Sequence, residues 1–174
     1  IECTVDRMRV LIEKLSSLPR GLEMERKSVD VKILVEHVLK QVKSDKRKRI
    51  SLETIINKTP LVSIDTHAIE MVLINLINNA CDAIEREGKI ECRVWEENNI
   101  IKLSVTDNGK GISDAFIDTS LFKPFKSSKK GGLGVGLYQC KTILEAHNGR
   151  IEVKSKEGLG TTFTISLPHV ETKR

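Results

Sequence analysis

Two glycine-rich segments, separated by a polar span, constrain this chain more than any other feature of its sequence. The first, DNGKGI at residues 107–112, follows an alternating apolar pattern that is typical of a strand. The second, GGLGVGL at residues 131–137, comes directly before an amphipathic helical pattern. Backbone N–H groups at a helix N-terminus carry partial positive charge, and glycine lets an anion approach them closely. The two segments together predict a phosphate-binding site at the start of a helix.

A predicted helix over residues 66–86 precedes both glycine segments and carries a polar stripe. It is apolar over most of its surface, but Asn75, Asn78, Asn79 and Asp82 recur at helical spacing on one side. Asparagine is a poor helix former and is costly to bury without partners, so three within five residues need a reason. Carboxamide oxygens suit magnesium, which also keeps water and phosphate ligands. The alternative is an ordinary polar stripe that faces solvent.

Asp107 ends the second of two alternating strands, which are predicted over residues 90–94 and 101–105 and joined as an antiparallel hairpin through Asn98 and Asn99. Its position continues the inward parity of that strand, so its carboxylate should point into the core or into a cleft. A buried carboxylate must find hydrogen-bond donors. The exocyclic amine of adenine would supply one.

The remaining elements are predicted from the same kind of pattern. They are an extended entry and a helix within residues 28–42, strands over 50–56 and 61–64, a helix over 134–147, and a hairpin of 150–155 with 161–167. The span 113–130 has few apolar anchors beyond Phe122 and Phe125 and is interpreted as a lid, although these two side chains would equally serve ordinary packing. Residues 1–18 are predicted to form an apolar-faced helix, ended by Pro19, that needs partners. A helical bundle in a preceding segment would supply them, and folding back on its own domain is the alternative.

Composition removes several classes of function. The net charge is +5 and the densest basic run covers residues 46–49, but only 3% of residues are aromatic and no groove-reading motif is present, so we expect no nucleic acid. No apolar run reaches the roughly 18 residues of a membrane span, and no signal peptide opens the chain. Cys3, Cys81, Cys92 and Cys140 lack metal-binding spacing and are expected to be reduced packing residues of a cytoplasmic domain. An inner-membrane anchor would lie elsewhere in a longer protein.

Four ordered motifs resemble those of one known family, the catalytic ATP-binding domain of sensor histidine kinases in the GHKL superfamily. They are the N box (NLINNA, 75–80), the first glycine box (DNGKG, 107–111), the F box (FKPF, 122–125) and the second glycine box (GLGVGL, 132–137). The resemblance extends over about residues 60–168. Residues 1–18 resemble the end of the second helix of the family's dimerisation and phosphoacceptor bundle. This divides the chain into a bundle-helix stub, 1–20, and a catalytic domain, 21–174.

The resemblance implies a fold and an activity. The fold is an α/β two-layer sandwich of the Bergerat type, in which a mixed or antiparallel sheet carries three helices on one face. The implied activity is transfer of the γ-phosphate of ATP, with magnesium, to a histidine on an upstream helix that this segment lacks. The longer protein would be a homodimer and would pass the phosphoryl group to a response regulator receiver domain.

The resemblance also implies residue roles. Asn79 would bind magnesium and Asn75 would support it, Asp107 would accept a hydrogen bond from the adenine amine, and Gly111 would let the base approach the backbone. Lys123 and Lys129 are candidates for phosphate charge. The further residues implied at the nucleotide are Asp82, Gly109, Ile112, Phe122, Gly132, Leu133, Gly134, Val135, Gly136, Leu137 and Thr162.

Two departures from the family pattern keep alternatives open. Asp82 stands where many members carry a basic residue, although an acidic residue occurs in nitrogen-regulator-like kinases, so its role is undecided. No phosphoacceptor motif is present, and the four histidines, His37, His67, His147 and His169, are expected to be structural or exposed. The alternatives are a GHKL-type ATPase, which would need a glutamate at Asn75, an anti-sigma-like serine kinase, and a non-catalytic nucleotide sensor.

Overall fold

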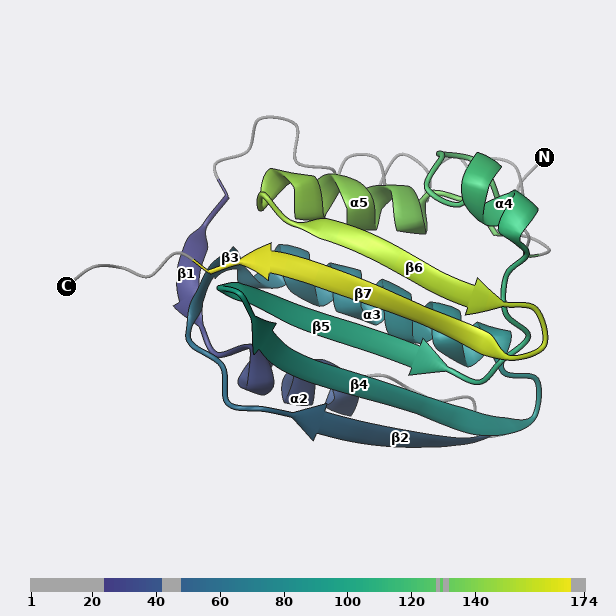
Figure 1. The fold of residues 1–174 in the computed structure, drawn as a ribbon, viewed down its shortest axis with the longest axis horizontal. Coiled ribbons are helices and arrows are strands. Elements are labelled where there is room, and N and C mark those ends of the chain that lie inside the picture. Colours follow the sequence, from purple (N-terminus) through teal and green to yellow (C-terminus); the bar gives the residue numbers. More distant parts are fainter. Residues whose placement is uncertain (1–23, 42–47, 128, 130–131, 170–174) are drawn as a thin grey trace, which may run out of the picture.

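The computed structural model describes residues 24–41, 48–127, 129 and 132–169. Its main sheet has five strands in the spatial order β2-β4-β5-β7-β6 (Figure 1). The strands are β2 (Arg49–Ile56), β4 (Glu87–Glu97), β5 (Ile100–Asp107), β7 (Gly160–Pro168) and β6 (Arg150–Lys156). The β2–β4 pair is parallel and the other three pairs are antiparallel, so the sheet is mixed.

Three helices of the described residues, α2 (Val31–Gln41), α3 (Thr66–Ala83) and α5 (Gly136–Ala146), cover one face of this sheet (Figure 1). The central helix α3 packs between α2 and α5 and against β5. A short helix, α4 (Asp114–Thr119), lies beyond β6, and β1 (Arg26–Val29) pairs with β3 (Val62–Asp65) in a separate antiparallel ribbon. The predicted two-layer α/β sandwich is therefore confirmed. Within the described residues, no helix is long and apolar enough to cross a membrane.

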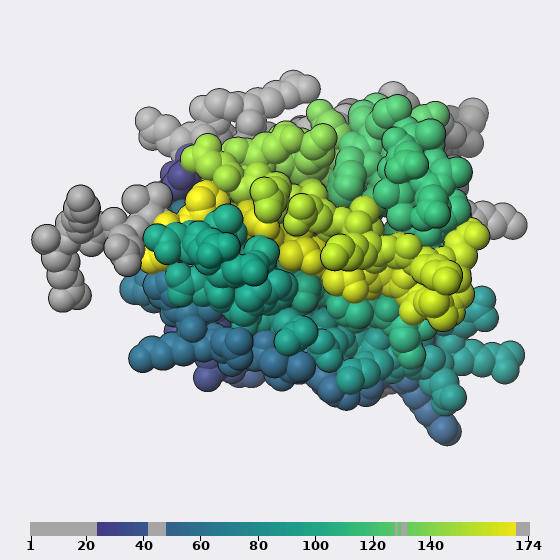
Figure 2. Space-filling view, in the orientation of Figure 1, coloured from purple at the N-terminus to yellow at the C-terminus, as the bar shows by residue number. Residues whose placement is uncertain are grey.

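Alternation along the strands separates a buried face from a polar one. The side chains of Ile101, Leu103 and Val105 on β5 are buried against the helices, where they meet the apolar side of α3. On the opposite face of the sheet, the side chains of the strands form the surface of the protein, as the space-filling view shows (Figure 2). Thr106 and Thr162 are directly opposite each other in the β5–β7 register, and their hydroxyl groups are hydrogen-bonded at 3.0 Å. The hydrophobic core therefore lies between the sheet and the helices.

Helix α3 begins where the sequence predicts and ends earlier. Asp65 is its N-cap, and the Asp65 Oδ1 atom accepts a hydrogen bond from Ala68 N at 3.0 Å. The predicted end at residue 86 is wrong, because Ile84 has extended backbone angles and the helix stops at Ala83. Lys48 stabilises this end, since its Nζ donates to the carbonyl oxygens of Cys81 and Ile84 at 2.9 and 2.7 Å.

The other predicted elements lie close to their predicted positions, but their partners were not predictable. The two strands that follow α2 belong to different sheets, because β2 pairs with β4 in the main sheet and β3 pairs with β1. Asn98 and Asn99 have positive φ angles and form the tight β4–β5 turn. The predicted helix over residues 1–18, and with it the division at residue 20, lies outside the described residues.

His147 fastens the end of α5 to the start of α3. It is buried, its Nδ1 lies 2.7 Å from the carbonyl oxygen of Ile143, and its Nε2 accepts a hydrogen bond from Asp65 N at 3.0 Å. A carbonyl needs a donor and an N–H needs an acceptor, so the ring is neutral with its proton on Nδ1. The prediction of a structural role agrees with this position.

Replacement of His147 by phenylalanine is expected to lower the free energy of unfolding by about 1–3 kcal/mol, because the Asp65 N–H loses its acceptor. Chemical denaturation of the two proteins measures the difference. His67→Phe is the matched control, since His67 is exposed on the first turn of α3. Equal stability of the two variants would contradict a structural role for the buried ring.

Candidate functional site

A cleft of about 330 Å³ lies between α3, the end of β5 and the start of α5. The segment that links β5 to α5 forms its remaining wall, with apolar side chains such as Phe116 and Leu121. Most residues predicted for the site line this one cleft. They are Asn75, Asn79, Asp82, Asp107, Gly111, Ile112, Lys129, Gly132, Leu133, Gly134, Val135, Gly136 and Leu137.

The asparagines of α3 form a hydrogen-bonded chain. Asn75 Nδ2 donates to Cys140 Sγ on α5 at 3.4 Å, and Asn75 Oδ1 accepts from Asn79 Nδ2 at 3.2 Å. Burial raises the pKa of the Cys140 thiol to about 12, although the Asn75 amide acts in the opposite direction, so the thiol stays neutral. With its Nδ2 directed at Asn75, Asn79 presents Oδ1 to the cleft. The Asn75 amide therefore orients the Asn79 oxygen.

The Asn79 oxygen shares a cation with Asp82. Lys129 Nζ donates to Asn79 Oδ1 at 2.6 Å and to Asp82 Oδ2 at 2.8 Å. Both oxygens therefore already contact one cationic group. No cluster of three or more His, Cys, Asp or Glu side chains suited to a metal exists among the described residues. Magnesium fits such a sparse set, because it commonly binds one or two protein oxygens and completes its shell with water and phosphate.

Asp107 lies at the floor of the cleft and is only 5% exposed. Its Oδ1 accepts a hydrogen bond from Gly109 N at 2.8 Å. Burial raises the pKa of the Asp107 carboxyl, and hydrogen bonds from the backbone N–H groups of Gly109 and Thr161 oppose this shift. Because the pKa is raised in the folded state, ionisation of Asp107 reduces stability as the pH rises through that pKa. A ligand amine that donates to the carboxylate would recover part of this loss.

The first glycine segment is fixed against the β6–β7 hairpin. Gly111 has a φ of +70°, and a Cβ added there would lie 2.1 Å from the carbonyl oxygen of Lys156. The next residue, Ile112, donates its N–H to Ser155 Oγ at 2.9 Å. Only glycine satisfies both the backbone angle and the close approach. These contacts therefore fix the turn after Asp107 against the β6–β7 hairpin.

The second glycine segment leaves the N-terminus of α5 open to the cleft. Val135 is the N-cap residue, and its apolar side chain makes no capping hydrogen bond to the first turn. A Cβ added at Gly136 would lie 2.5 Å from Asn75 Nδ2, so glycine allows the helix to start directly beside the asparagine chain. Uncapped N–H groups and the helix dipole suit an anion at this point. Lys110 and Lys126 also line the cleft and add positive charge.

Comparison with known proteins agrees with this geometry. Residues 64–171 match the family model described as histidine kinase-, DNA gyrase B-, and HSP90-like ATPase. The match spans more than half of the chain. The chain belongs to this ATPase family.

The sensor histidine kinase ZraS from Escherichia coli is 37% identical to this domain over 165 residues, which are 94% of this chain and 35% of ZraS. The catalytic domain of histidine kinase ThkA is 30% identical with a TM-score of 0.75, and the match covers 87% of this chain and 100% of that domain. This chain therefore spans about a third of the length of ZraS and corresponds to the whole ThkA catalytic domain. Within the family, it is an ATP-binding domain of the histidine kinase type.

Two longer structures share the fold at lower identity. Full-length ShkA in complex with AMPPNP gives a TM-score of 0.81 at 22% identity, over 94% of this chain and 36% of that one. ThkA in complex with the response regulator protein TrrA gives a TM-score of 0.79 at 24% identity, over 99% of this chain and 50% of that one. These two likenesses concern the fold alone.

Four residues predicted for this kinase-type site do not line the cleft: Gly109, Phe122, Lys123 and Thr162. Gly109 contributes indirectly, because its N–H donates a hydrogen bond to the Asp107 carboxylate. Phe122 packs against the core, and Lys123 is exposed outside the cleft. Thr162 lies on the opposite face of the sheet with Thr106, and the neighbouring Thr161 takes its place at the cleft floor.

Several cleft residues were not singled out from the sequence. Thr161 is the clearest, because it is opposite Asp107 in the β5–β7 register and its hydroxyl lies 2.9 Å from Ser155 Oγ. Strand alternation would have found it once Phe163 and Ile165 were assigned to the core face. Lys110, Lys126 and Ser127 lie in the linking segment, where no periodic pattern indicates which side chains point inward.

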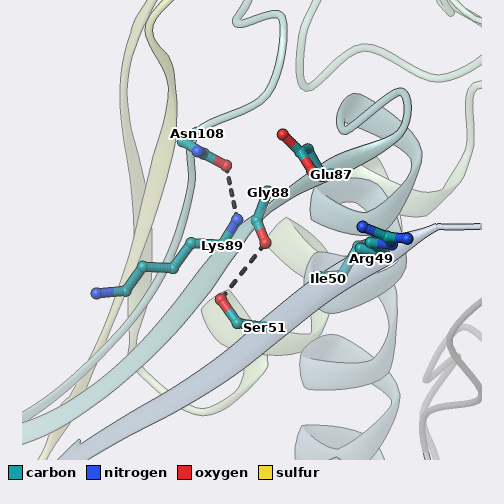
Figure 3. Close-up of a pocket in the computed structure, with 7 residues that line it drawn as sticks. All are labelled: Arg49, Ile50, Ser51, Glu87, Gly88, Lys89 and Asn108. Atoms are coloured by element: carbon teal, nitrogen blue, oxygen red, sulfur yellow. Dashed lines mark hydrogen bonds between the residues drawn. The ribbon is translucent and has the colours of Figure 1, made fainter.

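A second hollow, of about 600 Å³, lies at the edge formed by the starts of β2 and β4 (Figure 3). Its polar groups are hydrogen-bonded to one another, since Asn108 Oδ1 accepts from Lys89 N at 2.7 Å and Ser51 Oγ donates to the Gly88 carbonyl at 3.4 Å. The first contact links Asn108, the residue after Asp107, to β4, and the second links β2 to β4. The hollow thus supports the first glycine segment and does not resemble a ligand site.

Proposed function

We propose that this chain is the kinase domain of a longer sensor protein and transfers the γ-phosphate of ATP to a histidine on a preceding helical bundle. The observation that carries the proposal is the convergence of three separate features on one cleft. These are the buried carboxylate of Asp107, the oriented oxygen of Asn79 and the uncapped N-terminus of α5. The carboxylate suits a purine amine, the amide oxygen suits a divalent cation, and the helix N-terminus suits a polyphosphate.

In this proposal each group has one task. Asp107 accepts a hydrogen bond from the adenine amine, and the N–H groups that begin α5 hold the phosphate oxygens. Asn79, oriented by Asn75, would hold magnesium, which would supply neutralisation of charge on the transferred phosphoryl group. Phosphoryl transfer needs positioning and charge stabilisation more than covalent protein chemistry. The match of residues 64–171 to the histidine kinase-, DNA gyrase B-, and HSP90-like ATPase family supports ATP as the nucleotide.

The side chain of Asn75 favours transfer over hydrolysis. ATPases of the superfamily resemble one another in placing a glutamate one helical turn before the metal-binding asparagine, where it activates water. Here that position is Asn75, whose amide does not act as a base at neutral pH. Both ends of the amide are also engaged, with Cys140 and with Asn79. We therefore expect little hydrolysis of ATP by this chain alone.

The partners follow from the same assignment. The segment 1–20 is proposed to be the end of the bundle helix, and 21–174 the catalytic domain of a homodimeric parent protein. The ThkA complex with TrrA supports a response regulator as the next phosphate acceptor. Cys81, Cys92 and Cys140 are free thiols, which suits the reducing cytoplasm. A membrane anchor would then belong to the parent protein.

The test is a transfer assay with γ-labelled ATP. The chain alone is expected to bind ATP with magnesium but not to label itself or release phosphate appreciably. When a separate protein carrying the parent's bundle is added, its histidine should become labelled slowly, because the two parts are no longer tethered. The label should be lost in acid, since phosphohistidine is acid-labile.

Each contrary outcome identifies a different function. An acid-stable label on this chain or on an added protein would indicate a serine kinase. Rapid release of phosphate would indicate an ATPase. Tight ATP binding without transfer to any bundle histidine would leave a nucleotide sensor, and would overturn the proposed kinase activity.

A further inference from the structure

Lys129 links the segment between β5 and α5 to the polar stripe of α3. Its ammonium group donates to Asn79 Oδ1 at 2.6 Å and to Asp82 Oδ2 at 2.8 Å, across 50 and 47 residues of sequence. All three side chains line the cleft. The two oxygens belong to residues three positions apart on α3, so they face the same side of the helix. The ammonium therefore occupies a ready-made two-oxygen cation position.

The same oxygens are those that a divalent cation would use. Magnesium binds oxygen ligands at about 2.0–2.1 Å, closer than the ammonium lies to Asn79 Oδ1. Two cations that shared these oxygens would be only a few ångströms apart, at which distance their repulsion is strong. The divalent cation and the Lys129 ammonium must then exclude each other from this position.

We propose that Lys129 is an intramolecular stand-in for the divalent cation, which holds Asn79 and Asp82 until the metal displaces it. The proposal rests on the proposed function in one respect, that Asn79 is the metal ligand. It gives Asp82 a role that the family pattern leaves open. Asp82 holds the competing ammonium when no metal is bound and supplies the second oxygen when the metal enters.

The strength of the contact suits an exchangeable partner. The side chains of Lys129 and Asp82 are 35% and 59% exposed, and ion pairs with such exposure are weak. Asn79 is partly buried, and its oxygen is oriented by the hydrogen bond to Asn75. The Lys129 ammonium therefore has a fixed amide acceptor in addition to a weak ion pair. A divalent cation carries twice the charge and displaces the ammonium. The released ammonium then lies in a cleft that we propose for phosphate.

Manganese alone, without nucleotide, tests the exchange. The dissociation constant for Mn²⁺ is measured from paramagnetic broadening of the Asn79 side-chain amide signal. Lys129→Met should tighten Mn²⁺ binding by about 3- to 10-fold, because the competing ammonium is gone. Lys126→Met is the matched control, since it removes the same charge from the same cleft. Its effect should be clearly smaller.

The Asp82→Asn variant completes the test. It should weaken Mn²⁺ binding, and the gain from Lys129→Met should shrink in the double variant, because both substitutions act on one contact. The proposal is overturned if Lys129→Met leaves Mn²⁺ binding unchanged or weaker, if Lys126→Met has the same effect, or if no variant binds Mn²⁺ at these oxygens. ATP binding is measured separately, so a failure of the nucleotide assignment is recognised independently of a failure of the exchange.

Discussion

Replacing Asn79 with alanine is expected to reduce phosphoryl transfer to the bundle histidine by at least about 100-fold. The substitution removes the oxygen that we assign to magnesium, and the charge on the transferred phosphoryl group is then left without its main stabilisation. Asn79 is only partly buried and its partners are the side chains of Asn75 and Lys129, so the fold should remain. Transfer rates with γ-labelled ATP measure the effect, and circular dichroism checks the fold.

Asn57→Ala is the matched control for this variant, because Asn57 is exposed in the β2–β3 connection, away from the cleft. It should transfer phosphate at the rate of the unmodified chain. If Asn79→Ala retained transfer within a few-fold of that rate at saturating magnesium, Asn79 would not be the essential metal ligand. Asp82 would then have to bind the cation without it.

Asp107→Asn is expected to weaken ATP binding by about 1.5–3 kcal/mol, or roughly 10- to 150-fold, through loss of a charge-assisted hydrogen bond. The expected stability change has the opposite sign. Burial raises the pKa of the Asp107 carboxyl, so its ionisation reduces the stability of the fold. A neutral amide, which still accepts from Gly109 N, should leave the free energy of unfolding unchanged or higher. Calorimetry and chemical denaturation measure the two effects.

The purine base provides a second comparison for the same variant. GTP binding should suffer less than ATP binding, because the new amide donates toward a purine carbonyl. Asp118→Asn on the exposed side of α4 is the control and should change neither nucleotide's affinity. Unchanged ATP affinity in Asp107→Asn would remove Asp107 from base recognition.

The features that the sequence predicts well are those that repeat over short distances. The polar stripe on α3 and the inward parity of Asp107 follow from helical and strand periodicity, and both are present in the cleft. The N-cap role of Asp65 was also predictable, because capping depends on adjacent residues. The end of α3 was not, because Lys48 approaches it from another part of the chain.

The features that escaped prediction depend on distant segments. The parallel pairing of β2 with β4 brings together strands that have α3 and β3 between them in the sequence. Thr162 was predicted at the site, but Thr161 lines the cleft instead. The difference is one of register, because a shift of one residue moves a side chain to the other face of the sheet. The contact of Lys129 with Asn79 joins a segment without periodic pattern to a regular helix. No local signal in the sequence indicates it.

The position of β7 in the sheet has a consequence for the time at which the site forms during translation. β7 is the last strand of the described chain, yet it lies beside β5 and sets Thr161 opposite Asp107. A nascent chain that has emerged only as far as α5 contains the asparagine helix and both glycine segments. It still lacks Thr161 and the hairpin that supports Gly111. We therefore expect the nascent domain to bind ATP only after β7 has left the ribosome and joined the sheet.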